Sequence, residues 1–337
     1  MSNLTSVDKY QIIRPLGSGH FGQVYHAFDR ALHVEKAIKI LNEDDPNEFL
    51  QHLKEAQILA RCKHKNIVSI NEANIFRVES DQRVILDLEY VSEGSLEAAL
   101  KTRWISAKEA VGYMRCALQG LEHAHSQGFL HRDIKPGNIL LSPMGAKLSD
   151  FGLATDAGPA LHGSPQGYTT HLPPEYFSLQ ATTESTDIFA AGITLFRAIS
   201  NISDWHSISM SIPNFRRHVE RGSLISQIGF QSYLPPKIRR IVSKACHKDP
   251  QQRYRSARDF GQELDKLRFS IDWFRTTPLS WEGRLNGDVY TAMIDERSLK
   301  SLVKKNGRRQ TEHCLDFTTL SEAQSFIESH IAASTLN

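Results

Sequence analysis

Two stretches decide the fold of this chain: HRDIKPGNIL at His131–Leu140 and DFG at Asp150–Gly152. The first places ionisable and amide side chains at short spacings around a turn. Asp133 is a carboxylate that can accept the proton of an attacking hydroxyl group. Lys135, two residues further on, can neutralise the negative charge that builds up on a transferred phosphoryl group. The stretch therefore predicts Asp133 and Lys135 as catalytic residues.

Two further polar side chains of the same stretches suit a divalent metal ion. Asn138 and Asp150 supply hard oxygen ligands, the kind that Mg²⁺ requires, from two neighbouring segments. Pro136 and Gly137, directly before Asn138, favour a turn rather than a helix or a central strand. We expect Asn138 and Asp150 to hold the metal.

A glycine-rich stretch, GSGHFGQV at Gly17–Val24, lies upstream. It separates two strand-like runs instead of leading from a strand into a helix, which argues against a dinucleotide-binding fold. Glycines here would let the backbone close over triphosphate oxygens, because no Cβ stands in the way. Taken alone, the pattern is equally that of an ordinary hairpin turn.

Lys39 follows in KAIKIL, with Ala37 on the same face of the expected strand. An inward-pointing lysine beside a small apolar residue suits a phosphate group next to a flat base. Glu55 lies in the next predicted helix, from which it could fix the Lys39 ammonium group. Taken singly, each charged residue could instead be an ordinary solvated side chain.

The order of strand and helix signals predicts two lobes. Short β-rich runs over residues 10–41 indicate an antiparallel meander. A helix is predicted to begin at Asp45, with Pro46 in its first position and Glu48 completing a capping box. Another strand-like stretch is VILDLEYV. Helices are predicted after it, in LEAAL, AKEAVGYMRCALQGLEHAH, DIFAAGITLFRAI and PKIRRIVSKACH. We expect a small β-rich lobe, a pivot at residues 89–94, and a larger helical lobe.

The pattern changes again after Leu267. Asn286-Gly287, between SWEGRL and DVYTAMI, is a strong signal for a β-hairpin. A last helix is predicted to begin near Thr319, with Glu322 closing a capping box. One apolar stripe marks its inner face: Ala323, Phe326, Ile327 and Ile331.

Basic residues cluster in this C-terminal segment. They are Lys300, Lys304, Lys305, Arg308 and Arg309. Because acidic residues elsewhere in the segment offset them, we interpret the cluster as a solvated face and expect no nucleic-acid partner. With about 60 residues the segment is near the lower limit for an independent core. We therefore expect it to dock on the rest of the chain and to serve either partner or substrate docking or regulation.

Composition is that of an ordinary globular protein. The 337 residues are 40% hydrophobic and 23% charged, and the net charge of +2 gives no strong attraction to nucleic acid or membrane. The four cysteines form no CxxC pair, which argues against a disulfide framework or a zinc site. No apolar run approaches the ~20 residues that cross a bilayer, and the N-terminal residues show no signal peptide or myristoylation motif. We expect a cytoplasmic protein.

Taken together, the motifs resemble the eukaryotic-type serine/threonine protein kinase family. GxGxxGxV, AIK, a helical glutamate, HRDIKPGN, DFG and a PPE in place of APE occur in that family's order, over residues 10–267. The resemblance implies an α+β, bilobal protein kinase fold, with a β-rich N-lobe, a helical C-lobe and a small C-terminal α+β segment. It also implies ATP, Mg²⁺ (with Mn²⁺ as the alternative) and protein substrates. Lys135 is typical of enzymes that phosphorylate serine or threonine.

The expected domain bounds follow from the resemblance and the change after Leu267. They are an N-terminal tail at 1–9, a protein kinase domain at 10–270 (N-lobe 10–89, hinge 89–94, C-lobe 95–270) and a C-terminal extension at 276–337.

The resemblance implies roles for individual positions in the cleft. Next to the gatekeeper Leu88, backbone groups of Glu89 and Val91 would bind adenine. The residues expected to bind the nucleotide are Leu16, Gly17, Ser18, Gly19, Gly22, Val24, Ala37, Lys39, Glu55, Glu89, Val91 and Leu140.

Other positions are implied to be structural. Asp187, in TDIFAAG, is similar to the aspartate that holds the catalytic-loop backbone, and Glu175 is expected to pair with Arg253. Three residues resemble members of the packed spine that links the lobes: His131, Phe151 and Leu59.

Arg132 brings a cation next to the catalytic aspartate. In the family, such arginines are usually met by a phosphate on the activation segment, so we expect autophosphorylation there. The segment offers Thr155, Ser164, Tyr168, Thr169 and Thr170. The alignment of GSPQGYTTHLPPE with the family pattern is ambiguous, and our hypothesis is Thr169 or Thr170.

Lys36 stands where the family usually has valine. By strand alternation it should point away from the nucleotide, and we expect it to be solvated.

Two alternatives stand beside an active protein kinase. One is a catalytically inactive kinase-fold scaffold or nucleotide sensor. The other is a small-molecule kinase of related fold, which the long segment between DFG and PPE disfavours.

Overall fold

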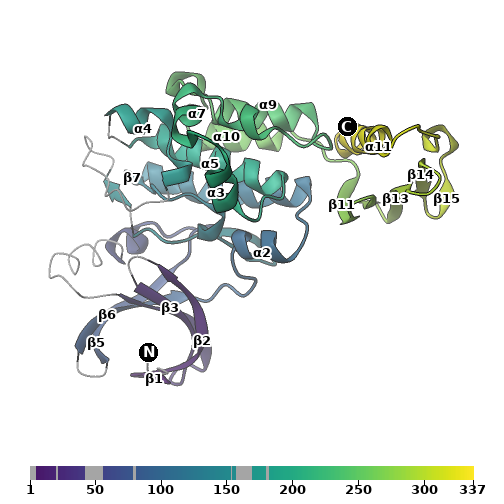
Figure 1. Cartoon of the computed structure of the whole chain (residues 1–337). Coiled ribbons are helices and arrows are strands. Elements are labelled where there is room, and N and C mark those ends of the chain that lie inside the picture. The colour runs from purple at the N-terminus through teal and green to yellow at the C-terminus, as the bar shows by residue number, and fades with distance from the viewer. Residues whose placement is uncertain are drawn as a thin grey trace.

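Two lobes and a small appended domain make up the chain (Figure 1). The computed structural model describes residues 5–19, 22–41, 56–78, 81–152, 154–156, 169–179 and 182–337. A curled β-sheet forms the first lobe and a bundle of helices the second. The appended domain lies at one side of the helical lobe and carries the C-terminus. The predicted α+β, two-lobed architecture is confirmed.

The N-lobe is one antiparallel sheet with the strand order β1-β2-β3-β4-β6-β5. Its strands are β1 (Ser6–Val7), β2 (Tyr10–Gly19), β3 (Gly22–Asp29), β4 (Val34–Leu41), β5 (Ile70–Val78) and β6 (Asp81–Glu89). The meander predicted over residues 10–41 is confirmed. The sheet begins before residue 10, because β1, inside the predicted tail, pairs with β2. Two residues are too few to leave a periodic signal in the sequence.

The helix between β4 and β5 is described over residues 56–61. Its predicted start, with Asp45, Pro46 and Glu48, lies outside the described residues. So does Glu55, the proposed partner of Lys39.

Lys36 is buried, so the expectation of a solvated side chain was wrong. The residue is 9% exposed, and its Nζ lies 3.4 Å from Oδ1 of Asp87. Asp87 also accepts a hydrogen bond from the Tyr10 hydroxyl at 2.9 Å. Strand alternation correctly put Lys36 on the face opposite Ala37 and Lys39, which line the cleft between the lobes. The curl of the sheet encloses that opposite face, and the ion pair offsets the cost of burying the ammonium group.

The C-lobe confirms the four predicted helices. They are α2 (Leu96–Thr102), α3 (Ala107–Ser126), α5 (Glu184–Ile199) and α9 (Pro236–Ala245). The remaining helices are α4 (Pro174–Leu179), α6 (Trp205–Ser211), α7 (Phe215–Arg221), α8 (Leu224–Ile228) and α10 (Ala257–Asp265). Helix α5 is buried along almost its whole length and forms the centre of the lobe. Across the described residues, no helix is both long and apolar enough to span a membrane.

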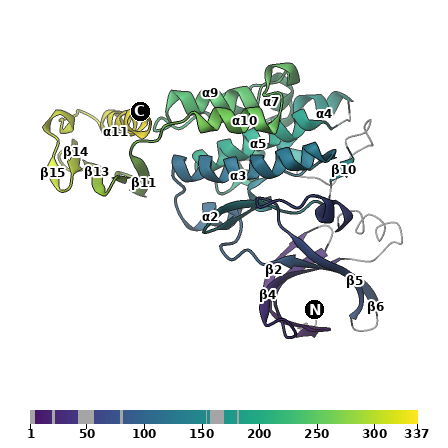
Figure 2. The ribbon, with the colours of Figure 1, turned by 180° about the vertical axis from the view of Figure 1, so that it is seen from behind.

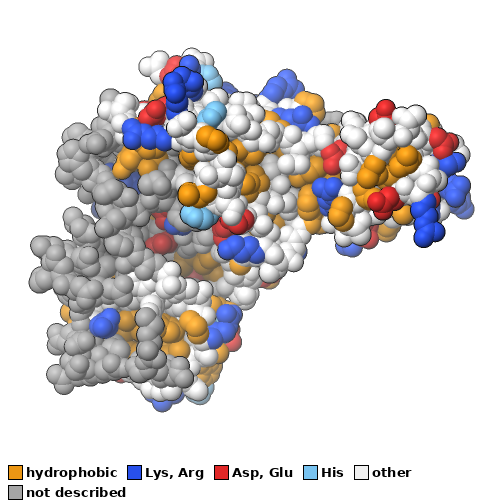
Figure 3. All heavy atoms as spheres, viewed as in Figure 1, with side chains coloured by type: hydrophobic (Ala, Val, Ile, Leu, Met, Phe, Trp, Pro, Cys, Tyr) orange, Lys and Arg blue, Asp and Glu red, His pale blue; other side chains and the backbone are white. Residues whose placement is uncertain are grey.

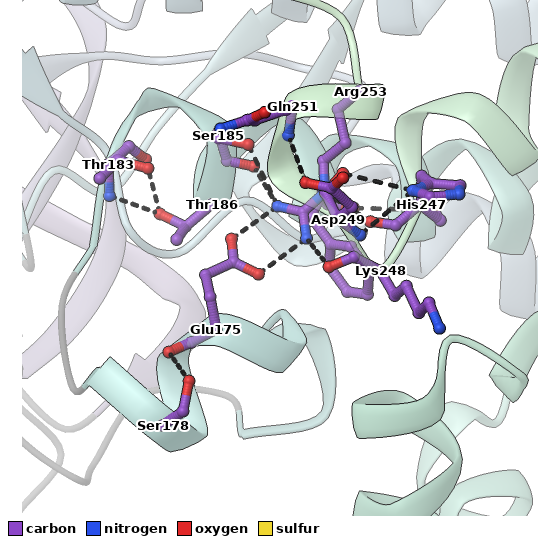
Figure 4. A network of polar contacts seen from close by, with 12 residues as sticks. Glu175, Ser178, Thr183, Ser185, Thr186, His247, Lys248, Asp249, Gln251 and Arg253 are labelled. Atoms are coloured by element: carbon purple, nitrogen blue, oxygen red, sulfur yellow. Dashed lines mark hydrogen bonds and ion pairs between the residues drawn. The ribbon is translucent and has the colours of Figure 1, made fainter.

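The predicted pair of Glu175 and Arg253 is confirmed (Figure 4). Nη1 and Nη2 of Arg253 donate to the two carboxylate oxygens of Glu175 at 2.6 and 2.7 Å. Arg253 is 3% exposed and also donates to the backbone oxygens of Ser185 and His247. Because its donors are satisfied, the buried guanidinium group can anchor α4 firmly to the C-lobe.

The C-terminal extension is a five-stranded antiparallel sheet with one helix. Its elements are β11 (Asp272–Thr277), β12 (Ser280–Leu285), β13 (Asp288–Asp295), β14 (Lys300–Lys305), β15 (Arg308–Arg309) and α11 (Leu320–Thr335). Asn286 and Gly287 have φ angles of 51° and 89°, as a tight hairpin turn requires, so the predicted hairpin is confirmed. The capping box of Thr319 and Glu322 at the start of α11 is confirmed as well. The sheet begins at residue 272, slightly before the expected 276.

An aromatic cluster joins the extension to the C-lobe. Trp281 is 3% exposed, and its ring lies 5.3 Å from that of Trp104 and 5.0 Å from that of Tyr233. The guanidinium group of Arg275 lies over both tryptophan rings, at 5.4 and 5.9 Å. The apolar core of the C-lobe therefore continues into the extension.

We predict that Trp281→Ala lowers the free energy of unfolding by about 3–5 kcal/mol, because it empties the centre of this cluster. Urea unfolding followed by tryptophan fluorescence and by circular dichroism measures the loss. Phe274→Ala, which removes a half-buried ring from the other face of the same sheet, is the control and should cost clearly less. Equal losses of unfolding free energy in the two variants would contradict the conclusion that the aromatic cluster joins the extension to the C-lobe.

Candidate active site

A cleft of about 450 Å³ lies between the lobes. The sheet of the N-lobe forms its roof, and α2, β8 (Ile139–Ser142) and the segment before it form its floor. Of the residues predicted to bind the nucleotide, these line the cleft: Leu16, Gly17, Ser18, Gly22, Val24, Ala37, Lys39, Glu89, Val91 and Leu140. Gly19 belongs to the same hairpin through its pairing with Gly22, and Glu55 lies outside the described residues.

The glycine-rich stretch is the tip of the β2–β3 hairpin, as its position between two strand-like runs indicated. Gly17 pairs with Val24, and Gly19 pairs with Gly22. Gly22 has a φ of 148°, and a Cβ built on it would collide with the carbonyl oxygen of Ile40 on β4. Glycine is therefore required at this position to hold the hairpin against the neighbouring strand.

Lys39 reaches across the cleft to Asp150. Its Nζ lies 2.9 Å from Oδ1 of Asp150. Enclosure by the lobes would raise the pKa of this carboxyl group, yet the Lys39 ammonium group holds it below the ordinary value. Asp150 is thus an anion whose side chain remains 38% exposed toward the cleft.

Asp133, Lys135 and Asn138 form a second polar group, in which Asn138 lines the cleft. Lys135 Nζ donates to Oδ2 of Asp133 at 2.6 Å. Nδ2 of Asn138 donates to the same oxygen at 2.9 Å and to the backbone oxygen of Asp133 at 2.8 Å. With its nitrogen engaged in this way, Asn138 keeps its amide oxygen for another ligand. Asp133 is 9% exposed and held in one orientation by two donors.

The donor chemistry of Asn138 and Asp150 fits a divalent cation. Both residues line the same cleft, and they present an amide oxygen and an ionised carboxylate. Hard oxygen atoms of this kind suit Mg²⁺ and Mn²⁺.

Asp187 holds the backbone that carries Asp133. Its carboxylate oxygens accept hydrogen bonds from the backbone N–H groups of His131 at 2.9 Å and Arg132 at 2.8 Å, and from Nε2 of His125 at 2.9 Å. Arg132 has a φ of 69°, a left-handed conformation that is unfavourable for a residue with a side chain. The buried Asp187 carboxylate therefore stabilises a strained turn directly before Asp133, the residue predicted to be catalytic.

His131 and Phe151 are packed together, as expected of two spine residues. Their rings meet edge to face at 4.6 Å, and both residues are fully buried, as is Leu59. Nδ1 of His131 accepts a hydrogen bond from the backbone N–H of Asp133, and Nε2 lies 3.1 Å from the Ser149 carbonyl oxygen. Burial lowers the pKa of His131, so the ring is neutral, and its role is to pack against Phe151.

Arg132 lies half-buried beside this turn without an acidic side chain at ion-pair distance in the described part of the chain. Burial lowers the pKa of its guanidinium group. Of the phosphorylation candidates, Ser164 and Tyr168 lie outside the described residues, and for Thr155 and Thr169 only the backbone is described. Thr170 is half-buried, with its hydroxyl 3.4 Å from Nδ1 of His171.

Sequence reasoning missed the support of the hinge. Tyr90 lines the cleft, and its ring stacks on that of His26 on β3 at 3.8 Å and 10°. Nη2 of Arg14 donates to the Tyr90 hydroxyl at 3.2 Å. The position of Tyr90 between Glu89 and Val91 was a signal for its place in the cleft. No local pattern, however, links it to His26, which is far away in the sequence.

The fold and the cleft define the class of this protein: it contains a protein kinase domain. Residues 10–262 match the family model described as protein kinase domain, and the chain belongs to the eukaryotic-type serine/threonine protein kinase family. The resemblance found in the sequence is confirmed.

Individual relatives come from bacteria and from mouse. Serine/threonine-protein kinase PrkC of Bacillus subtilis is 32% identical over 305 residues, which cover 87% of this chain and 44% of PrkC. Serine/threonine-protein kinase PknA of Mycobacterium tuberculosis is 28% identical, covering 79% of this chain and 62% of PknA. Mouse Aurora kinase B is 31% identical over 253 residues, covering 74% of this chain and 70% of that kinase. The chain thus spans about half the length of the two bacterial kinases.

The depressed pKa of Asp187 makes the stability of the turn at residues 131–133 pH-dependent. Buried hydrogen bonds, above all that from His125, hold this pKa below the ordinary value although burial alone would raise it. The ionised carboxylate therefore contributes stability above about pH 4, the ordinary aspartate pKa, and the contribution is lost as the pH falls through the depressed value.

We predict that Asp187→Asn costs about 3 kcal/mol or more at neutral pH, because it removes the charge from a buried network. In urea unfolding at several pH values, the variant should lose less stability than the wild type between neutral and acidic pH. Asp316→Asn, an exposed pair partner in the extension, is the control and should follow the wild-type profile. A profile for Asp187→Asn that runs parallel to that of the wild type would contradict the assignment.

Proposed function

We propose that the protein is an ATP-dependent serine/threonine protein kinase that transfers the γ-phosphoryl group of ATP to hydroxyl groups of protein substrates. The observation that carries the proposal is the orientation of Asp133. Its Oδ2 is engaged by Lys135 and by Asn138, and Asn138 lines the same cleft as the Lys39–Asp150 pair.

Asp133 acts as the base in this mechanism. Because both side-chain contacts are made by Oδ2, we assign Oδ1 to the acceptor hydroxyl, whose proton it takes as the oxygen attacks phosphorus. The new O–P bond forms while the bond between the γ-phosphorus and the bridging oxygen breaks, and ADP leaves with that electron pair. Lys135 stabilises the charge on the equatorial oxygens.

The nucleotide would bind under the β2–β3 hairpin. Lys39 would contact the phosphates, and apolar side chains would enclose the base: Leu16, Val24, Ala37 and Leu140. The backbone of Glu89 and Val91 would meet the adenine edge. Asn138 and Asp150 would hold Mg²⁺, with Mn²⁺ as the alternative, and the bound cation would neutralise phosphate charge.

The relatives and Lys135 favour serine or threonine as the acceptor. PrkC and PknA are both named serine/threonine-protein kinases. Every predicted catalytic and metal position is occupied by a suitable side chain, so no observation in the described residues favours the inactive-scaffold alternative. The cytoplasmic location remains a prediction from the sequence, and we propose that the C-terminal extension recruits substrates.

We predict that Asp133→Asn lowers the rate of phosphate transfer to a protein substrate by ~100- to 10,000-fold, because the base is lost. Radiolabel incorporation from ATP measures the rate. Lys39→Ala should also be impaired, whereas Lys266→Ala, at an exposed lysine that pairs with Glu263, serves as the matched control. Activity of Asp133→Asn equal to that of the wild type would refute the mechanism. Faster phosphorylation of small alcohols than of protein would favour a small-molecule kinase.

We further propose that the kinase autophosphorylates on Thr169 or Thr170, and that the phosphate pairs with Arg132. The half-buried guanidinium group of Arg132 supports this, because a desolvated cation gains from a dianionic partner.

We predict that tryptic peptides of the active protein carry phosphate on Thr169 or Thr170. Arg132→Ala should lower activity more in the phosphorylated protein than after phosphatase treatment, because only the phosphorylated form contains the ion pair. Active protein with neither residue modified, shown by mass spectrometry, would sink this assignment.

A further inference from the structure

A hairpin of cations forms the outer end of the C-terminal extension. The basic hairpin, Lys304–Arg309, joins β14 to β15 through a turn at Asn306 and Gly307, with φ angles of 48° and 77°. In Figures 1 and 2 this hairpin lies at the end of the extension that is remote from both lobes. Figure 3 shows Lys and Arg side chains gathered at the same end.

The register of the hairpin places like charges directly opposite each other. Lys304 pairs with Arg309, and Lys305 pairs with Arg308. Because side chains alternate along a strand, the two pairs lie on opposite faces of the sheet. Like charges in directly opposed positions destabilise a sheet. Four cations in two such pairs therefore carry a structural cost.

Most of this charge is left uncompensated. Lys305 pairs with Asp288 at 2.6 Å. In the part of the chain that the structure describes, no ion pair is recorded for Lys304, Arg308 or Arg309. Elsewhere in the same sheet cations are neutralised: Arg284 by Glu282 at 2.9 Å and Lys300 by Asp316 at 3.0 Å. The arrangement of the basic hairpin is thus unfavourable for the isolated sheet and favourable for an anionic partner.

We propose that the basic hairpin binds an acidic segment of a protein substrate. This inference rests on the proposed function and names the chemistry of the substrate that the extension recruits. A carboxylate-rich strand offers charges spaced along a backbone, which matches cations spaced along a two-stranded hairpin.

Two observations disfavour nucleic acid as the partner. The hairpin itself contains no aromatic side chain on which a base could stack. An acidic residue also lies beside it, because Asp288 pairs with Lys305 at 2.6 Å. Its charge would repel a continuous phosphate backbone, whereas a peptide with a short acidic run can avoid it.

Binding at this distance from the cleft acts through effective concentration. An acidic segment held on the hairpin keeps a phosphoacceptor elsewhere in the same substrate near Asp133. We therefore expect the hairpin to lower KM for substrates that carry such a segment and to leave the chemical step unchanged.

A binding experiment tests the inference without any need for catalysis. The full-length protein is titrated into a fluorescein-labelled glutamate-rich peptide, and fluorescence anisotropy is measured. Lys304→Gln/Arg309→Gln should weaken binding by about tenfold, since two charged contacts are lost, and binding should weaken further with salt. The matched control, Arg284→Gln/Lys300→Gln, removes the same charge from the same sheet and should bind like the wild type.

Three outcomes would overturn the proposal. One is equal peptide affinity in the wild type and in Lys304→Gln/Arg309→Gln. The second is tighter binding of single-stranded RNA, or of phosphatidylserine vesicles, than of the peptide. The third is a lower melting temperature for Lys304→Gln/Arg309→Gln, because relief of like-charge opposition should leave stability unchanged or raise it.

A kinetic experiment distinguishes a failure of this inference from a failure of the proposed function. A model substrate is compared with and without a glutamate-rich tail on a flexible linker. The tail should lower KM for the wild type and leave KM unchanged for Lys304→Gln/Arg309→Gln, with kcat equal in both. Peptide binding without any phosphorylation would contradict the proposed kinase activity alone. Phosphorylation that does not respond to the tail would contradict the docking role alone.

Discussion

The buried carboxylate of Asp187 is the constraint on which the geometry of the active site depends. The chain must turn sharply between β7 (Phe129–Leu130) and Asp133, and it does so through a left-handed Arg132. Two backbone N–H groups exposed by that turn donate to Asp187, which extends from the fully packed helix α5. A strained loop is thereby tied to a helix that is buried along almost its whole length. Without that anchor the turn would relax, and Asp133 would lose its fixed position.

Charge in the cleft and beside it is arranged in two separate groups, and this separation suits their different tasks. In the upper group, Lys39 keeps Asp150 ionised, so that a carboxylate and an ammonium group face the cleft together. In the lower group, Lys135 and Asn138 hold Asp133 by one oxygen. The first group is suited to polyphosphate and cation, the second to a hydroxyl group. Each group is held by contacts within the chain, so little reorganisation is needed at the moment of reaction.

The sequence predicted those parts of the molecule that depend on local chemistry. The capping box at Thr319, the turn at Asn286-Gly287 and the strand face of Lys39 follow from near neighbours. Errors and omissions arose where distant segments meet. Lys36 is buried because the whole sheet curls over it, and Tyr90 is supported by a ring from another strand. The opposition of cations in the basic hairpin likewise required the register of β14 and β15, which composition alone does not contain.

The way the extension is attached bears on how it could act. Trp104, which contacts Trp281 of the extension, lies between α2 and α3, and α2 contributes Ala98 to the floor of the nucleotide cleft. Extension and C-lobe thus share one core, so the basic hairpin has a fixed position relative to Asp133. Any flexibility must then come from the substrate. The linker between its acidic segment and its phosphoacceptor has to span a set distance. The effective concentration of the phosphoacceptor falls when the linker is much shorter or longer than that distance. Selection by such a site would therefore depend on the spacing between acidic segment and phosphoacceptor as well as on charge.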